Sequence, residues 1–167
     1  EIVISNTAKV ADLKYQIMLA NMYFEDQQYE EAASISARAN EMLEGEMYEG
    51  LLVYAKSAGA LGNLGVALDF YQRAFLLKPT QVDPLFFSGV MLLENKKPKL
   101  AMEQFERVQR ANPNYPDLQY QWAVAKKKVA VKERSKEMAI EAIALCKNEL
   151  AKNTAHYQSH LLIAESY

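Results

Sequence analysis

Cysteine, histidine and net charge are all scarce in this chain of 167 residues. Cys146 is the only cysteine, so no disulfide can form within the chain, and no Asn-x-Ser/Thr acceptor for glycosylation occurs. The formal net charge of -2 gives no basic field that would attract nucleic acid. No apolar run approaches the roughly 18 residues of a membrane-spanning helix. These absences favour an intracellular, cytoplasmic protein without a nucleic-acid partner or a membrane span.

The two histidines are too few to build a catalytic or metal site by themselves. His156 and His160 are four positions apart, a spacing that places two ligands on one helix face. No further Cys or His lies near them in the sequence to complete the coordination, so we predict no metal and no cofactor. No set of nucleophile, base and orienting acid can be assembled around them either, so we predict a chain that is not an enzyme.

What the chain does contain is a repeat with a period of about 34 residues. Small residues that follow a bulky one recur in steps of 35, 34, 34 and 41, at Ala20, Ala55, Gly89, Ala123 and Ala164. A second small residue stands twelve positions after each of the first three, at Ala32, Ala67 and Ala101. Pro79 and Pro113 mark the same period independently, since they are separated by one full repeat. Self-similarity of this length is typical of stacked repeat architectures.

Each repeat has the pattern of a helix hairpin. Apolar residues at helical spacing are followed by a short polar or glycine-bearing break (EDQQY, GNLG, ENKKP) and then by a second helical segment. The paired small residues fall where the two helices of a hairpin must approach closely. Gly59, Gly62 and Gly65 have the spacing of a phosphate-binding loop, but no Gly-Lys-Ser/Thr follows them and no strand precedes them. We therefore assign them to the turn of the second hairpin.

These features resemble the tetratricopeptide repeat: the period, Tyr23 three positions after the first small residue, the aromatic residues Tyr71 and Phe105, and the closing prolines. The resemblance implies an all-α fold, a right-handed solenoid of stacked antiparallel hairpins. It places the whole chain, residues 1–167, in one array, with units at about 13–47, 48–81, 82–115 and 116–156 and the start of a fifth unit at 157–167. The chain begins and ends within this pattern, so we expect a piece of a longer repeat protein.

The fourth unit departs from the period. Its second-helix positions, assigned to Ala139, Ile143 and Cys146, come four positions late, and the preceding segment KKKVAVKERSKE has no Gly or Pro. The extra residues are therefore predicted to lengthen the helices by about one turn. Cys146 then occupies a core position, which favours a buried, unreactive thiol.

In the tetratricopeptide repeat, the first helix of each hairpin lines a concave groove. The resemblance therefore implies a partner-binding groove at Ile17, Asn21, Phe24, Leu52, Lys56, Phe86, Val90, Leu93, Tyr120 and Val124. The middle of this set is unusually apolar, which favours a groove for an extended peptide or a helix of another protein. The alternative is that these side chains pack against neighbouring repeats of the same chain.

The basic residues between Lys126 and Lys136 also have two interpretations. They could dock an acidic partner or nucleic acid, but the interleaved Glu133 and Glu137 favour a solvated helix surface. The function expected from the whole sequence is a non-catalytic scaffold that holds partner subunits or peptides in a multiprotein assembly. The alternative is a self-contained adaptor or chaperone, similar to bacterial secretion chaperones, that captures a short linear motif. The apolar residues of the final LLIAESY favour the scaffold, because a self-contained array ends in a polar cap.

Overall fold

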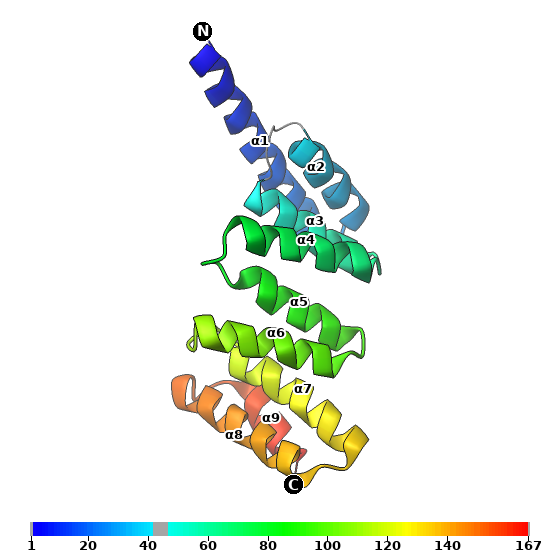
Figure 1. The fold of residues 1–167 in the computed structure, drawn as a ribbon, viewed down its shortest axis with the longest axis vertical. Helices are drawn as coiled ribbons and strands as arrows, with labels where there is room; N and C mark the ends of the chain where they lie inside the picture. Colours follow the sequence, from blue (N-terminus) through cyan, green and yellow to red (C-terminus); the bar gives the residue numbers. More distant parts are fainter. Residues whose placement is uncertain (1, 42–46, 167) are drawn as a thin grey trace. The chain divides into compact units, whose positions relative to one another are not determined.

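The computed structural model describes residues 2–41 and 47–166, with side chains described from residue 10 onward. In these residues the chain forms α-helices and no β-strand, which confirms the all-α prediction (Figure 1). The helices in chain order are α1 (Ile2–Glu25), α2 (Tyr29–Glu41), α3 (Tyr48–Ala60), α4 (Leu64–Leu77), α5 (Asp83–Glu94), α6 (Pro98–Ala111), α7 (Leu118–Glu133), α8 (Lys136–Lys152) and α9 (Tyr157–Ala164). Among the described residues, no helix is both long enough and apolar enough to cross a membrane.

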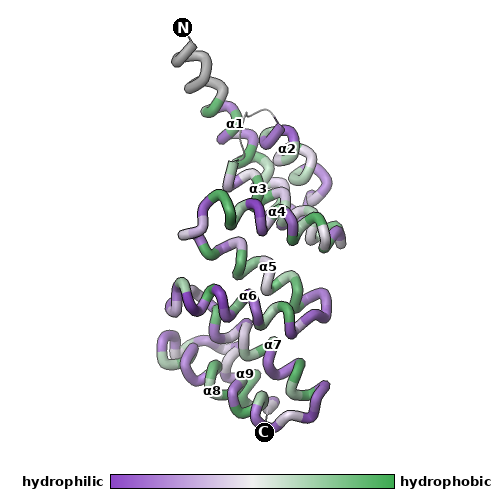
Figure 2. The backbone as a smooth tube through the Cα atoms, viewed as in Figure 1, coloured by the Kyte–Doolittle hydropathy of each residue, from purple (hydrophilic) through white to green (hydrophobic). Residues whose placement is uncertain are grey.

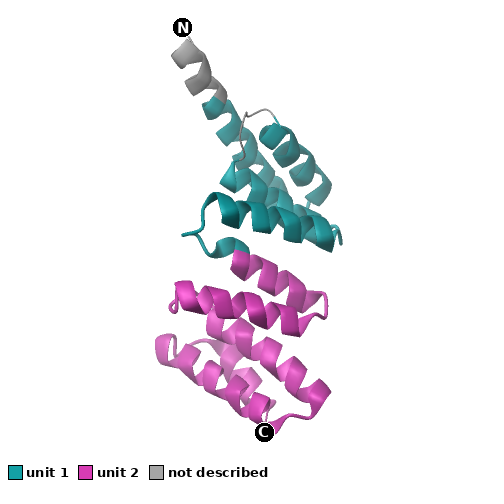
Figure 3. Ribbon diagram, viewed as in Figure 1, with its two compact units in different colours: residues 1–84 teal, residues 85–167 magenta. Residues whose placement is uncertain are grey.

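The helices fall into two compact units, residues 1–84 and residues 85–167, and the boundary lies in the first turn of α5 (Figure 3). In the first unit α1 packs on α2, α2 on α3 and α3 on α4. In the second unit α6 packs on α7, α7 on α8 and α8 on α9. Each unit is therefore a stack of helix hairpins, as predicted. That both units belong to one repeat array stays a prediction.

Small residues allow the helices of each hairpin to pack closely. In the first unit Ala20, Ala32, Ala55 and Ala67 are fully buried. In the second unit Gly89 of α5 faces the ring of Phe105 on α6, and a Cβ atom added to Gly89 would lie 2.6 Å from the ring carbon Cε1. The predicted sites of closest approach are confirmed at these positions.

The second helix of each hairpin buries three residues at spacings of four and three. The buried sets are Ala32, Ser36 and Ala39 in α2; Ala67, Tyr71 and Ala74 in α4; Ala101, Phe105 and Val108 in α6; and Ala142, Cys146 and Glu149 in α8. Figure 2 shows hydrophobic and hydrophilic residues alternating along α6, whereas α4 also exposes Val66, Leu76 and Leu77. This pattern is that of amphipathic helices packed on one face.

The predicted register of α8 is wrong by three positions. The structure buries Ala142, Cys146 and Glu149 where the sequence predicted Ala139, Ile143 and Cys146. The insertion is therefore seven positions long rather than four, because the step from Ala101 to Ala142 exceeds the regular period by that amount. The inserted residues do lengthen the helices, as predicted, since α7 and α8 have 16 and 17 residues, against 12 and 14 in α5 and α6. Only Arg134 and Ser135 separate the two long helices.

Only one of the three glycines assigned to the turn of the second hairpin lies in it. Gly62 stands between α3 and α4 with a φ of 83°, in the left-handed region that favours glycine. Gly59 lies in the last turn of α3 and Gly65 in the first turn of α4, which corrects the prediction. A two-helix turn of this kind needs only one residue with positive φ.

Candidate functional site

In the first unit, two of the predicted groove residues line a hollow of about 460 Å³. Ile17 and Asn21 of α1 lie there with Lys14, Met18, Met47, Glu49 and Lys78. Ile17 is only 4% exposed, so it contributes to the floor of the hollow. On its polar side Lys78 Nζ donates to Glu49 Oε1 at 3.0 Å. Partial burial acts to raise the pKa of Glu49, but hydrogen bonds from its backbone N–H and from Lys78 outweigh this and lower the pKa.

Of the other three groove residues predicted in this unit, Phe24 and Leu52 pack against their own hairpins. The ring of Phe24 lies 5.4 Å from the ring of Tyr29, and Leu52 packs on the buried cluster around Leu51. Lys56 is half-buried, and burial lowers the pKa of its ammonium group, while the carboxylates of Asp83 and Glu25 act in the opposite direction. Phe24 and Leu52 therefore serve mainly the stability of the unit.

In the second unit, the predicted groove residues of α5 lie in the core of the third hairpin. Phe86 is 9% exposed, and its ring centroid lies 4.7 Å from that of Tyr115 and 6.0 Å from that of Phe105. Leu93 is 4% exposed, and Val90 is half-buried. Phe86 and Leu93 thus match the alternative interpretation, in which groove residues pack within their own repeat array.

Tyr120 and Val124 of α7, in contrast, face a hollow of about 510 Å³ together with residues of α9. The apolar side of this hollow also includes Val131, Leu161 and Leu162, and its polar side consists of Lys127, Lys128, Gln158 and Glu165. Val131 is 72% exposed and Leu161 is 45% exposed. Lys127 and Glu165 form an ion pair of 2.9 Å at this hollow. We call this feature the α7–α9 hollow.

Two of the four lysines of α7 are paired with neighbouring carboxylates. Lys126 pairs with Glu141 of α8, and Lys127 pairs with Glu165. The charge of Glu133 is in turn paired with Lys99 of α6. The side chains of Lys126 and Lys127 are only 14% and 25% exposed, so the favoured interpretation of the sequence, a solvated helix surface, stays a prediction.

An apolar face on α1 was not predicted from the sequence. Tyr15, Met18 and Met22 are 70%, 54% and 58% exposed, and Tyr15 and Met18 line a hollow of about 300 Å³ with Ala11 and Lys14. The sequence does contain the signal, because the residues at positions 11, 15, 18 and 22 recur at helical spacing. The repeat pattern instead marks the opposite face of the helix, which carries the buried Leu13, Ile17 and Ala20.

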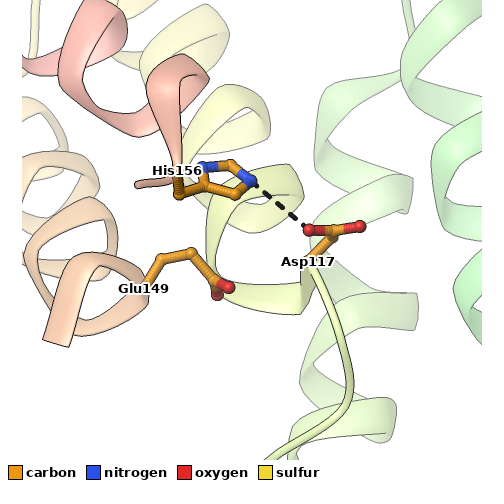
Figure 4. A group of neighbouring side chains, drawn as sticks. All are labelled: Asp117, Glu149 and His156. Carbon is orange, nitrogen blue, oxygen red and sulfur yellow. Dashed lines mark ion pairs between the residues drawn. The ribbon is translucent and has the colours of Figure 1, made fainter. Parts of the chain in front are cut away.

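A group of polar side chains in the second unit was also not predicted (Figure 4). Asp117 precedes α7, Glu149 lies near the end of α8, and His156 precedes α9. One donor atom from each residue lies within 4.8 Å of the other two. His156 Nε2 is 3.3 Å from Asp117 Oδ1, and the His156 side chain is 9% exposed. His160, the other candidate ligand, is exposed and its ring is not in this group; its Nε2 lies 3.0 Å from the Thr154 carbonyl oxygen.

Cys146 lies one turn before Glu149 on α8 and is fully buried. Burial raises the pKa of its thiol, while a hydrogen bond with Ser159 acts in the opposite direction. The predicted burial of the thiol is therefore confirmed, and its low reactivity stays a prediction.

Comparison with known proteins shows similarity in structure but not in sequence. No model of a known protein family matches the chain, and no curated protein matches it. Among solved structures, MamA from AMB-1 aligns with 94% of this chain and 81% of its own, at 18% identity and a TM-score of 0.70. A tetratricopeptide repeat protein from Parabacteroides merdae ATCC 43184 aligns with 93% of this chain and 57% of its own, at 14% identity and a TM-score of 0.74. YrrB, described as a TPR protein with an unusual peptide-binding site, aligns with 89% of this chain and 71% of its own, at 22% identity and a TM-score of 0.64.

These likenesses, which combine low sequence identity with high structural similarity, show the fold. The chain has the fold of the tetratricopeptide-repeat proteins, an all-α architecture of the solenoid class. The resemblance stated from the sequence is confirmed at this level.

Proposed function

We propose that this chain is a protein-interaction module that binds a segment of another protein in the α7–α9 hollow. The observation that carries the proposal is the grouping of Tyr120, Val124 and Leu161 around a hollow of about 510 Å³. Exposed apolar side chains gathered around a concavity are typical of recognition sites for a partner's helix or extended peptide. YrrB, which shares the fold, has a peptide-binding site according to its description.

The charges around the hollow define the partner segment further. Lys127 is already paired with Glu165, whereas Lys128 is exposed and forms no ion pair with another described residue. A partner segment with a large apolar side chain could bury it in the hollow, and an acidic residue beside that side chain could pair with Lys128. The apolar anchor would supply most of the affinity and the acidic residue the orientation.

The wider role that we propose is that of a scaffold in a multiprotein assembly, with other proteins as partners and no catalytic step of its own. An adaptor or chaperone that captures a short linear motif is the alternative. Both roles use the same hollow. They differ in whether the bound segment belongs to a folded subunit or to a free motif.

Peptide selection tests the proposal even though the partner is unidentified. Random peptides displayed on phage would be selected on the purified chain, and the affinity of the enriched peptides would be measured by fluorescence anisotropy. We expect enriched peptides with an apolar anchor and an acidic neighbour. Val131→Glu and Leu161→Glu should each weaken them at least tenfold, because they place a carboxylate against the apolar anchor.

Ile140→Glu is the matched control. Ile140 lies on α8 of the same unit, is 66% exposed and does not line the α7–α9 hollow. Its substitution should leave peptide affinity unchanged. If the enriched peptides bind both hollow variants as well as the parent, or if no peptide is enriched, the hollow is not a peptide site. Concentration-dependent self-association that Val131→Glu abolishes would assign the hollow to a second copy of the chain instead.

A further inference from the structure

We propose that Asp117, Glu149 and His156 form a binding site for one divalent transition-metal ion, of the zinc type, that fastens the starts of α7 and α9 to the end of α8. The three side chains converge from these three places in the second unit (Figure 4). One imidazole and two carboxylates form a nitrogen and oxygen donor set, which suits zinc and similar ions. The site shares no residue with the α7–α9 hollow, but it adjoins it, since the ring of Tyr120 in the hollow lies 5.1 Å from the ring of His156.

Glu149 is the first argument, because packing does not explain its presence. It occupies the third buried position of α8, where the second helices of the other hairpins carry Ala39, Ala74 and Val108. Each of those three residues is fully buried and apolar. A carboxylate at this position is unfavourable in an apolar core unless it has a specific partner. The repeat architecture therefore predicts an apolar residue where this chain has an acidic one.

The environment of Glu149 is the second argument. The residue is 6% exposed, and its Oε2 atom is buried without a hydrogen-bond partner. Among the described residues no Lys or Arg forms an ion pair with it. Lys152, one turn later on α8, donates instead to the Pro113 carbonyl oxygen at 3.1 Å. Buried carboxylate oxygens are normally paired or bound to a metal, so an unpartnered one facing His156 and Asp117 indicates a cation.

The donor geometry is the third argument. His156 Nε2 and Asp117 Oδ1 are 3.3 Å apart. Two ligands at zinc–nitrogen and zinc–oxygen distances of about 2.0–2.1 Å in tetrahedral geometry are themselves separated by about 3.3 Å. The Glu149 oxygen lies within 4.8 Å of both atoms and would move closer to them to complete the coordination. Two carboxylates and a neutral imidazole balance the charge of a divalent ion.

His156 can adopt two tautomers: one suits a metal ligand, whereas the Ser159 N–H, which can only donate and lies 3.2 Å from Nδ1, favours the other. Its Nδ1 atom is 2.8 Å from Oγ of the fully buried Ser159. When Nδ1–H donates to this hydroxyl oxygen, the Nε2 lone pair is free and directed toward Asp117, as in metal-binding histidines held by an outer partner. In the other tautomer Nδ1 accepts from Ser159 N–H and Nε2–H donates to Asp117. That tautomer satisfies Asp117 but provides nothing for Glu149.

Titration of the metal-free, full 167-residue chain with Zn²⁺ in excess Mg²⁺ tests the proposal, with calorimetry and thermal melting as readouts. We expect one Zn²⁺ per chain and a higher melting temperature when it binds, since an ion that binds only the folded state stabilises it. Glu149→Gln and Asp117→Asn should each weaken binding at least tenfold. Asp117 has a φ of 57°, and asparagine tolerates this left-handed conformation well, so the second variant keeps the fold.

Two control variants and a spectroscopic measurement make the outcome decisive. His160→Gln removes the other histidine and Cys146→Ala the thiol, and both should leave Zn²⁺ affinity unchanged. Co²⁺ should give visible bands of tetrahedral coordination without a thiolate charge-transfer band. The site is disproved if Zn²⁺ does not bind, if Glu149→Gln binds it as well as the parent, or if His160→Gln or Cys146→Ala weakens it equally. None of these readouts depends on a bound peptide, so the metal site and the proposed function can fail independently.

Discussion

The third and fourth hairpins have the same spacing of buried positions but opposite chemistry. In the third hairpin, α6 presents Phe105 and Val108 to an apolar core, in which the Phe105 and Tyr115 rings pack on Phe86. In the fourth, α8 presents Cys146 and Glu149 at the equivalent positions, and polar side chains of neighbouring segments face them. The hairpin geometry therefore determines which positions are buried, but both apolar and polar residues can occupy them. A carboxylate at such a position, unlike Ser36, whose hydroxyl bonds to its own helix, calls for a further explanation.

The largest effect on stability is expected from overpacking the third hairpin, α5–α6. Gly89→Leu should lower the unfolding free energy by about 3 kcal/mol, because the new side chain cannot fit against the Phe105 ring. Chemical denaturation of the purified chain would measure the change. The clash would push α5 and α6 apart and should also disturb the aromatic packing around Phe86, visible as altered near-ultraviolet circular dichroism.

Gly65→Ala is the control for this change. Gly65 also lies in a helix, but a Cβ atom added there would meet nothing within 4 Å. It should therefore be neutral or stabilise the chain by up to about 1 kcal/mol through helix propensity. A Gly89→Leu variant as stable as the parent would contradict the close approach of α5 and α6.

A smaller change in stability, of opposite sign, is expected when the buried carboxylate of the fourth hairpin is replaced by an apolar residue like that of the third. In the presence of a chelator, Glu149→Val should raise the unfolding free energy by about 1–2 kcal/mol, because it replaces a buried, unpartnered carboxylate with the residue type of Val108. The measurement is denaturation with and without Zn²⁺. The parent should gain stability from Zn²⁺ and the variant should not.

A loss of stability in the chelated Glu149→Val variant would contradict this comparison. It would show that the Glu149 carboxylate is stabilised by other groups of the protein itself. Glu141→Val is the matched control, since Glu141 is an exposed residue of the same helix that is paired with Lys126. This substitution should change stability by less than about 1 kcal/mol.

The sequence predicted the regular part of the fold well, because each signal there has a local cause. Gly62 supplies the positive φ of a turn, and the paired small residues supply close helix packing. The register of α8 was predicted wrongly because the inserted residues continue the helices without any Gly or Pro to mark them. The step of 41 positions from Ala123 to Ala164 does exceed the period by the seven inserted residues. Ala164, however, is exposed in the structure and is not the small core residue that the repeat pattern predicted.

The candidate sites were less predictable, for geometric reasons. Tyr120 and Val124 were identified because one face of a helix can be read from its period. Phe86 and Leu93 belong to the same predicted set but are buried, since one residue turns a helix by about 100° and shifts a side chain from groove to core. Asp117 and His156 are far apart in the sequence and meet only through the turns that precede α7 and α9. No local pattern in the sequence indicates that two such distant residues lie close together in the fold.

The smallest predicted effect concerns how the long hairpin begins its second helix. Ser135 accepts a hydrogen bond from the Met138 N–H, whereas Asn63 and Lys97, which precede α4 and α6, make no such side-chain bond. Ser135→Ala should therefore lower the unfolding free energy by about 1 kcal/mol, and Lys97→Ala should leave it nearly unchanged. Chemical denaturation of both variants measures the difference. Equal effects would mean that the two-residue turn, with Arg134 at a φ of 54°, fixes the start of α8 without its cap. A cost at Ser135 alone would show that the longer hairpin relies on a local hydrogen bond where the shorter ones rely on packing.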